Sequence, residues 1–147
     1  MIYYHATPKR NLKSILKRGL STSGSLALGM ESEDTVGKVF LARDKAEALW
    51  NVLHEDSFSF PDEPPAGARF WSLLKVALPD DWPLDQDSYG FLYSESPIPP
   101  EYLSVEEVDV VGERTLRRKV RDEIYKGSTE RYFSKDFWDR ADSYGWR

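Results

Sequence analysis

The sequence predicts a mixed α+β fold in which two small antiparallel sheets pack together and a helical extension follows them. Three observations support this class. Five short β-type runs are clustered between turns, single amphipathic helical stretches separate some of them, and a basic segment with helical periodicity ends the chain. Clustered strands with single helices are typical of α+β proteins rather than of regularly alternating α/β proteins.

Length and composition favour one globular domain in the cytoplasm. The chain has 147 residues, of which 40% are hydrophobic and 31% charged. No apolar run approaches the roughly 20 residues that span a bilayer, and no signal peptide follows Met1, so we expect no membrane association. The absence of cysteine excludes disulfides and thiol chemistry. Two histidines without an HExxH motif disfavour a transition-metal site.

Charge divides the chain into two expected parts. Residues 1–111 hold 10 basic and 18 acidic residues, whereas residues 112–147 hold 10 basic and 7 acidic ones. The acidic body argues against non-specific DNA binding over its whole surface. For the basic, aromatic extension at 112–147, two interpretations remain: a helix packed on the domain with a solvated basic face, or a patch for nucleic acid or an acidic partner.

The first expected elements are a strand over 2–7 and a helix over 9–20. Thr7 is a candidate cap and Pro8 would occupy the first helical position, which suits proline. Gly19 is placed to end the helix in a left-handed conformation. The helix has one apolar stripe: Leu12, Ile15, Leu16 and Leu20.

The later elements follow from the same periodicities. A short strand over 38–42 precedes Asp44 and Glu47, which have capping-box spacing for a helix over 45–54. The strongest β-type run, 69–78, predicts a central strand. Two further strands are expected at 89–93 and 105–111, and a last short helix after Ser134.

His5 is the first candidate functional residue, because it lies near the end of the first strand, beside the expected helix start. A ring in that position can be offered to a ligand. A satisfied, partly buried histidine is the alternative, and the residues around it do not decide between the two.

Three stretches, taken in order, resemble one family. The run YHATPKRNLKSILKRGL, residues 4–20, is similar to the opening of the ADP-ribosyltransferase fold in DNA-modifying toxins and RNA 2′-phosphotransferases. Residues 37–44, GKVFLARD, resemble the Gly-Lys-Gly-Ile-Tyr-Phe-Ala stretch of poly-ADP-ribose polymerase-like enzymes. Residues 89–103 resemble the closing segment that ends in Pro-Pro-Glu-Tyr-Leu. The resemblance covers roughly residues 2–111 and implies an ADP-ribosyltransferase-like sandwich.

The resemblance also implies an NAD site between the two sheets. His5 would hydrogen-bond the ribose next to nicotinamide, the backbone at Ala6 would hold the carboxamide, and Phe40 would stack on the nicotinamide ring. Ala6 stands where the family usually has glycine. The remaining expected NAD-binding residues come from the same stretches: Thr7, Arg10, Arg43 and Tyr89. For Arg10 and Arg43, a pyrophosphate contact and a plain surface position both stay open.

The family's glutamate has no direct counterpart. Aligning the Pro-Pro-Glu-Tyr-Leu ends places it on Tyr89 or Gly90, neither of which is acidic. Asp87 and Glu95 flank that position and are the candidate catalytic acids after a small shift of register. Both are also consistent with solvated loop acids.

The expected function is therefore NAD-dependent mono-ADP-ribosyl transfer to a macromolecular target, protein or nucleic acid, by a bacterial or phage effector, toxin or anti-defence protein. One alternative is a binding module for NAD, ADP-ribose or an RNA phosphate that has lost the glutamate and its turnover. A second is a protein-interaction domain.

Overall fold

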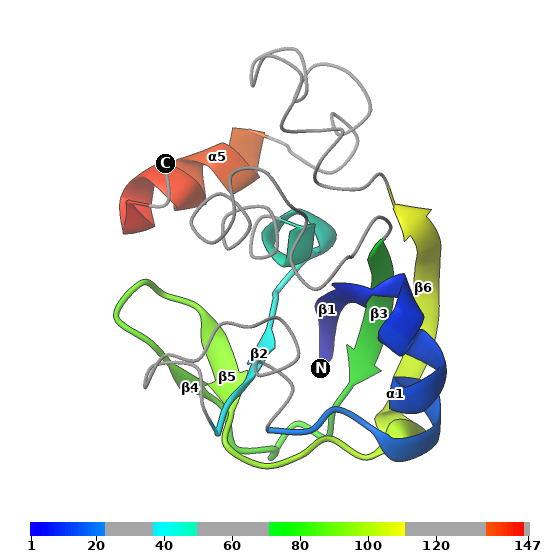
Figure 1. Cartoon of the computed structure of the whole chain (residues 1–147). Helices are drawn as coiled ribbons and strands as arrows, with labels where there is room; N and C mark the ends of the chain where they lie inside the picture. Colours follow the sequence, from blue (N-terminus) through cyan, green and yellow to red (C-terminus); the bar gives the residue numbers. More distant parts are fainter. Residues whose placement is uncertain (23–36, 50–70, 111–134, 146–147) are drawn as a thin grey trace.

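The computed structural model describes residues 1–22, 37–49, 71–110 and 135–145. Within these ranges the chain is a mixed α+β structure with two three-stranded antiparallel sheets and a C-terminal helix (Figure 1). The elements, in chain order, are β1 (Ile2–Pro8), a 3-10 turn (Lys9–Asn11), α1 (Leu12–Arg18), β2 (Val39–Leu41), β3 (Trp71–Ala77), β4 (Asp85–Gln86), β5 (Leu92–Ser94), a second 3-10 turn (Pro100–Tyr102), β6 (Leu103–Val110) and α5 (Lys135–Tyr144).

The first sheet has the order β1-β3-β6 and the second β2-β5-β4. The central position predicted for the 69–78 run is confirmed, because β3 pairs with β1 on one side and β6 on the other. The two sheets meet at an isolated bridge between Tyr4 and Ala42. Its two backbone hydrogen bonds, Tyr4 N–H to Ala42 O and Ala42 N–H to Tyr4 O, are each 2.8 Å long.

The helix start predicted at Thr7-Pro8 is wrong. Thr7 lies in β1 opposite Ser72, and Pro8 ends the strand opposite Trp71. Pairing with β3 holds the backbone extended to Pro8, so the chain turns through residues 9–11 before α1 begins. The strand predicted over 89–93 is also displaced, because residues 87–91 form the loop of a β4–β5 hairpin.

Gly19 ends α1 with φ +88° and ψ −177°, so the chain leaves the helix extended rather than in the left-handed helical conformation. Its N–H donates to Ile15 O at 2.7 Å, and Leu20 then pairs with Ile98. A Cβ at residue 19 would lie 2.2 Å from Ile98 O, so this close approach requires glycine.

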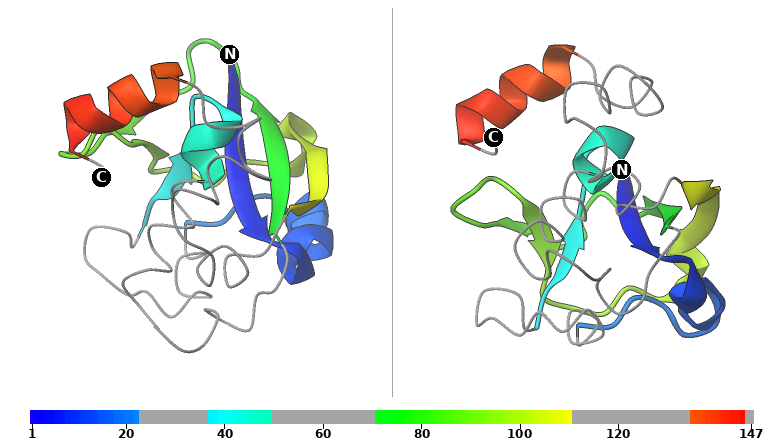
Figure 2. Two further views of the ribbon diagram at one scale, coloured as in Figure 1. Left: turned by 90° about the horizontal axis from the view of Figure 1, so that it is seen from above. Right: turned by 45° about the horizontal axis from the view of Figure 1, so that its top comes forward.

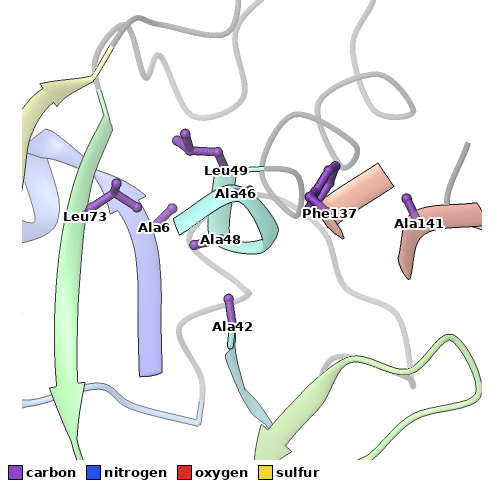
Figure 3. Close-up of a cluster of buried hydrophobic side chains, with 8 residues drawn as sticks. All are labelled: Ala6, Ala42, Ala46, Ala48, Leu49, Leu73, Phe137 and Ala141. Atoms are coloured by element: carbon purple, nitrogen blue, oxygen red, sulfur yellow. The ribbon is translucent and has the colours of Figure 1, made fainter. Parts of the chain in front are cut away.

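The core has two parts, one on each face of the first sheet. The inter-sheet cluster joins β2 to β3 and consists of Leu20, Val39, Leu41, Leu74, Val76, Leu78 and Ile98. The helix-side cluster packs β1 and β3 against a helical segment at 45–49 and against α5 (Figure 3). Its members are Ala6, Ala42, Ala46, Ala48, Leu49, Leu73, Phe137 and Ala141.

The helix expected after Ser134 is present as α5, and Phe137 and Ala141 are its buried residues. Both views in Figure 2 place α5 on the same side of the molecule as the β4–β5 hairpin. Residues 50–54 of the second expected helix, and residues 111–134 of the basic extension, lie outside the described residues.

Candidate functional site

The site predicted from the three motif stretches centres on the junction of the two sheets. The first stretch forms β1, the second forms β2 and the third contains β5. β1 meets β2 at the Tyr4–Ala42 bridge, and β2 pairs with β5 so that Phe40 lies opposite Tyr93. Stretches that are far apart in the sequence are thereby brought side by side.

The His5 ring spans this junction. Its Nδ1 atom lies 2.8 Å from Phe40 O. A carbonyl oxygen can only accept, so Nδ1 carries the proton in this bond and Nε2 keeps its lone pair. Burial lowers the pKa of His5 from 6.5, and the bond to the Phe40 carbonyl raises it by a smaller amount. The ring is therefore neutral at pH 7, and Nε2 has no hydrogen-bond partner within the described ranges.

Thr7 and Ser72 lie on the same face of the sheet as His5. Residues directly opposite one another on paired strands share a face, and His5 is opposite Leu74 whereas Thr7 is opposite Ser72. Thr7 and Ser72 are both buried, and Ser72 Oγ has no hydrogen-bond partner within the described ranges. The otherwise apolar inter-sheet face thus ends in polar side chains. Ala6 faces the other way, into the helix-side cluster opposite Leu73 (Figure 3).

Phe40 meets His5 through its backbone, and its ring lies on the other face of β2 from buried Val39 and Leu41. The rings of Phe40 and Tyr93 are 5.9 Å apart and inclined at 56°. Lys38 Nζ lies 4.6 Å from the centre of the Tyr93 ring, within the range of a cation–π contact. These three side chains form an aromatic and cationic face beside the junction.

Three acidic side chains influence the titration of the Tyr93 hydroxyl. Partial burial raises its pKa above 10.0, and the negative charges of Asp85, Glu95 and Asp87 raise it further. The hydroxyl therefore stays protonated at neutral pH and can donate a hydrogen bond. The same charges show that both candidate acids lie close enough to Tyr93 to affect its titration.

The two candidate acids differ in their surroundings. Asp87 Oδ1 accepts hydrogen bonds from the backbone N–H groups of Tyr89 and Phe91, both at 2.9 Å, and so fixes the hairpin loop. Glu95 is exposed, and its carboxylate has no hydrogen-bond or ion-pair partner within the described ranges. Tyr89 lies at the tip of the loop with 61% of its surface exposed.

The two arginines of the predicted site also differ. Arg10 is exposed in the 3-10 turn after β1. Arg43 is held by Glu47, because its Nη1 donates to Glu47 Oε1 at 2.9 Å and its backbone N–H donates to Oε2 at 3.1 Å. An anion would reach the Arg43 guanidinium only by sharing it with this carboxylate.

Glu47 is the centre of an ionic cluster that sequence reasoning identified only in part. The capping-box spacing is confirmed on one side, since Glu47 N–H donates to Asp44 Oδ1 at 2.8 Å. The Glu47 carboxylate reaches the N–H of Arg43 instead of that of Asp44, and it is completely buried. Arg140 of α5 completes the cluster by donating to Glu47 Oε2 at 2.9 Å and to Asp44 Oδ2. Burial raises the pKa of Glu47, and the two arginines oppose that shift.

No arrangement of three or more His, Asp or Glu side chains suited to a metal ion occurs among the described residues. Within the same ranges, every helix is too short or too polar to cross a lipid bilayer. Comparisons of the chain with protein-family models, with curated proteins and with solved structures gave no match.

Proposed function

We propose that the chain is an NAD-dependent mono-ADP-ribosyltransferase that modifies a macromolecule. The observation that carries the proposal is the convergence of the three motif stretches, through the His5–Phe40 hydrogen bond and the Phe40–Tyr93 pair. The resemblance implies a ligand between the two sheets, and these contacts lie where the sheets meet.

His5 is suited to the ribose contact in this proposal. A neutral ring whose Nδ1 is bonded to a carbonyl offers Nε2 as an acceptor for a ribose hydroxyl. The buried hydroxyls of Thr7 and Ser72 lie on the same face of the first sheet as His5. Within the described residues Ser72 Oγ makes no hydrogen bond, so it could bond to a ligand. The aromatic surface proposed for the nicotinamide is formed by Phe40 and Tyr93, whose rings lie beside the junction on the face away from the inter-sheet cluster.

The proposed reaction breaks the bond between ribose C1 and the nicotinamide nitrogen. Nicotinamide leaves with the bonding electron pair and becomes neutral, and the ribose passes through an oxocarbenium-like state that a nearby carboxylate stabilises. A nucleophilic group of the target then bonds to C1 and loses its proton to the carboxylate or to water. Of the two candidate acids, we favour Glu95 because its carboxylate is not engaged by the loop backbone as Asp87 is.

A binding module without turnover is the second candidate. It is favoured by one observation: the position aligned with the family's glutamate lies in the hairpin loop at Tyr89 and Gly90, where neither residue is acidic. Such a module would bind NAD, ADP-ribose or an RNA phosphate at the same junction.

The test measures NAD binding by calorimetry and nicotinamide release by chromatography. The variants are His5→Gln, Asp87→Asn and Glu95→Gln, with His54→Gln, at the chain's other histidine, as control. The proposal predicts release that His5→Gln and Glu95→Gln each reduce at least tenfold, while His54→Gln leaves it unchanged. Binding without release would instead support the module. Absence of binding to NAD, ADP-ribose and a phosphorylated RNA end would reject both and favour a protein-interaction domain.

A further inference from the structure

The C-terminal helix is connected to the His5 ring through side-chain hydrogen bonds and the short stretch of backbone at residues 40–43. The connection starts at Arg140, whose guanidinium donates to two carboxylates on the segment that follows β2. These partners, Asp44 and Glu47, are more than 90 residues away in the sequence. A contact of this kind fixes the position of one part of the chain relative to the other.

Glu47 links Arg140 to the backbone of the segment that follows β2. Its Oε2 atom accepts from Arg140 Nη1 at 2.9 Å and from the Arg43 backbone N–H at 3.1 Å. Because the carboxylate is completely buried, losing one cation leaves a charge that water cannot solvate. Glu47 therefore holds the start of its own helix and α5 in one arrangement.

The segment held by Glu47 leads directly to β2. Ala42, next to Arg43, makes the paired hydrogen bonds with Tyr4 that join the sheets. Phe40, two residues earlier, provides the carbonyl to which His5 Nδ1 donates. A shift of the segment would change the distance and angle of that bond, because a strand of three residues has little length over which to absorb it.

A second contact fixes the other end of α5. Tyr144 packs on Gly90, and its hydroxyl lies 3.2 Å from Gln86 Nε2 in the β4–β5 hairpin. Between the two ends, Phe137 and Ala141 are buried in the helix-side cluster (Figure 3). α5 thus bridges the segment after β2 and the hairpin of the same sheet.

We infer that Arg140 is a positioning residue for His5. Through Glu47 it holds residues 40–44 in the position where the Phe40 carbonyl selects the His5 tautomer that carries its proton on Nδ1 and keeps a lone pair on Nε2. This inference does not depend on which ligand binds at the junction, or on whether any reaction occurs there. It assigns to the C-terminal helix a role in shaping the site.

The experiment observes the ring directly. Histidine-labelled protein carrying His54→Gln has a single imidazole, so long-range ¹H–¹⁵N spectra report the tautomer and the titration of His5 without ambiguity. Arg140→Met removes the guanidinium and keeps an unbranched side chain. Lys135→Met is the matched control on the same helix, because Lys135 pairs only locally with exposed Asp139 in the described structure. Spectra are recorded well below each variant's melting temperature.

The parent protein is expected to show the Nδ1-protonated tautomer and a titration midpoint below 6.5. In Arg140→Met the two ring nitrogens should give averaged shifts, and the midpoint should fall below that of the parent, because the bond to the Phe40 carbonyl that opposes the effect of burial is weakened. Lys135→Met should match the parent, and Arg140→Lys should restore part of the parent tautomer preference. Superimposable His5 signals in folded Arg140→Met, or the same change in Lys135→Met, would overturn the inference.

A second variant covers the case in which Arg140→Met does not fold. Glu47→Gln combined with Arg140→Met removes the buried charge together with its partner, so the only carboxylate that loses Arg140 is that of Asp44, which is about half exposed to water. The neutral amide still accepts from Arg43, but the contact with α5 is absent. The inference requires the mixed tautomer in this double variant as well, and the parent spectrum there would reject it.

Discussion

The ring of Tyr144 fills the space that a side chain on Gly90 would need, since a Cβ at residue 90 would lie 2.4 Å from its Cε1 atom. Gly90 has φ +86°, in the region that favours glycine. Gln86 reinforces the contact by donating from Nε2 to Gly90 O at 3.1 Å. The β4–β5 hairpin and α5 therefore pack closely at residue 90, where only glycine fits.

Gly90→Ala is expected to destabilise the protein by about 2–4 kcal/mol, because the clash with Tyr144 adds to the cost of a positive φ. The measurement is urea unfolding with the m-value compared between proteins. Gly145→Ala is the matched control and should cost only about 1 kcal/mol. Gly145 has φ +73°, but no atom of the described residues lies within 4 Å of the position that its Cβ would take. Equal costs for the two variants would show that the Tyr144 contact is unimportant.

Arg140→Met is expected to cost about 3 kcal/mol, near the lower end of the range for breaking a buried ion pair, because Arg43 still faces Glu47. Adding Glu47→Gln should recover part of this loss, since it removes the buried carboxylate that Arg43 alone would otherwise have to balance. A double-mutant cycle by chemical denaturation measures the coupling. Strictly additive losses would mean that Arg140 and Glu47 do not act as a pair.

Asp87→Ala is expected to destabilise the protein by about 1–3 kcal/mol, because the hairpin loop loses an acceptor for two backbone N–H groups. Asp87→Asn keeps the Oδ1 acceptor and should cost much less. Thermal melts of the two variants test this difference. The comparison also makes Asp87→Asn the informative variant for activity, since a loss of nicotinamide release there would not come from a disrupted loop.

Local patterns are sufficient to predict several elements. The apolar run around residues 71–77 predicts a central strand, because a strand paired on both edges in a buried position needs apolar residues on both faces. The spacing of Asp44 to Glu47 identifies Asp44 as a cap, since that interaction is confined to one turn. The bridge between β1 and β2 is not predicted by any local pattern, because Tyr4 and Ala42 are 38 positions apart in the sequence.

Other features depend on partners far away in the sequence. Thr7 has the character of a helix cap, but pairing with Ser72 keeps it in a strand. The hairpin loop at 87–91 has β-type composition because of its aromatic residues, whereas Asp87 and Gly90 determine the turn. The sequence around Arg140 gives no signal of its role, because a buried ion pair with a residue 93 positions away leaves no periodicity.

His5 is expected to make the protein less stable as the solution becomes acidic. Its pKa is lowered on folding, so below about pH 6.5 the unfolded chain binds a proton more readily than the folded one. Relative to His5→Gln, the parent should lose stability as pH falls from 6.5 through the folded pKa, by at most about 1.4 kcal/mol per pH unit for one proton.

Denaturation series from pH 8 to pH 5 on both proteins measure this difference. The raised pKa of Glu47 acts in the opposite direction, but it is common to both proteins and cancels, as does His54. A stability difference that does not change with pH would contradict the lowered pKa of His5.

Two buried serines give the last prediction, because both are fully buried but only one is hydrogen-bonded within the described residues. Ser94 Oγ accepts from Trp82 Nε1 at 3.0 Å and donates to Ser96 O at 2.8 Å, whereas Ser72 Oγ has no partner there. Ser94→Ala should therefore cost about 1–3 kcal/mol, and Ser72→Ala should be neutral or stabilising by up to about 1 kcal/mol. Unfolding measurements on the unliganded proteins compare the two, and a cost at Ser72 as large as that at Ser94 would contradict the prediction.

If a ligand uses the Ser72 hydroxyl on the His5 face of the sheet, Ser72→Ala should weaken NAD binding although it leaves the stability of the free protein unchanged. A serine with a purely structural role would not produce this combination.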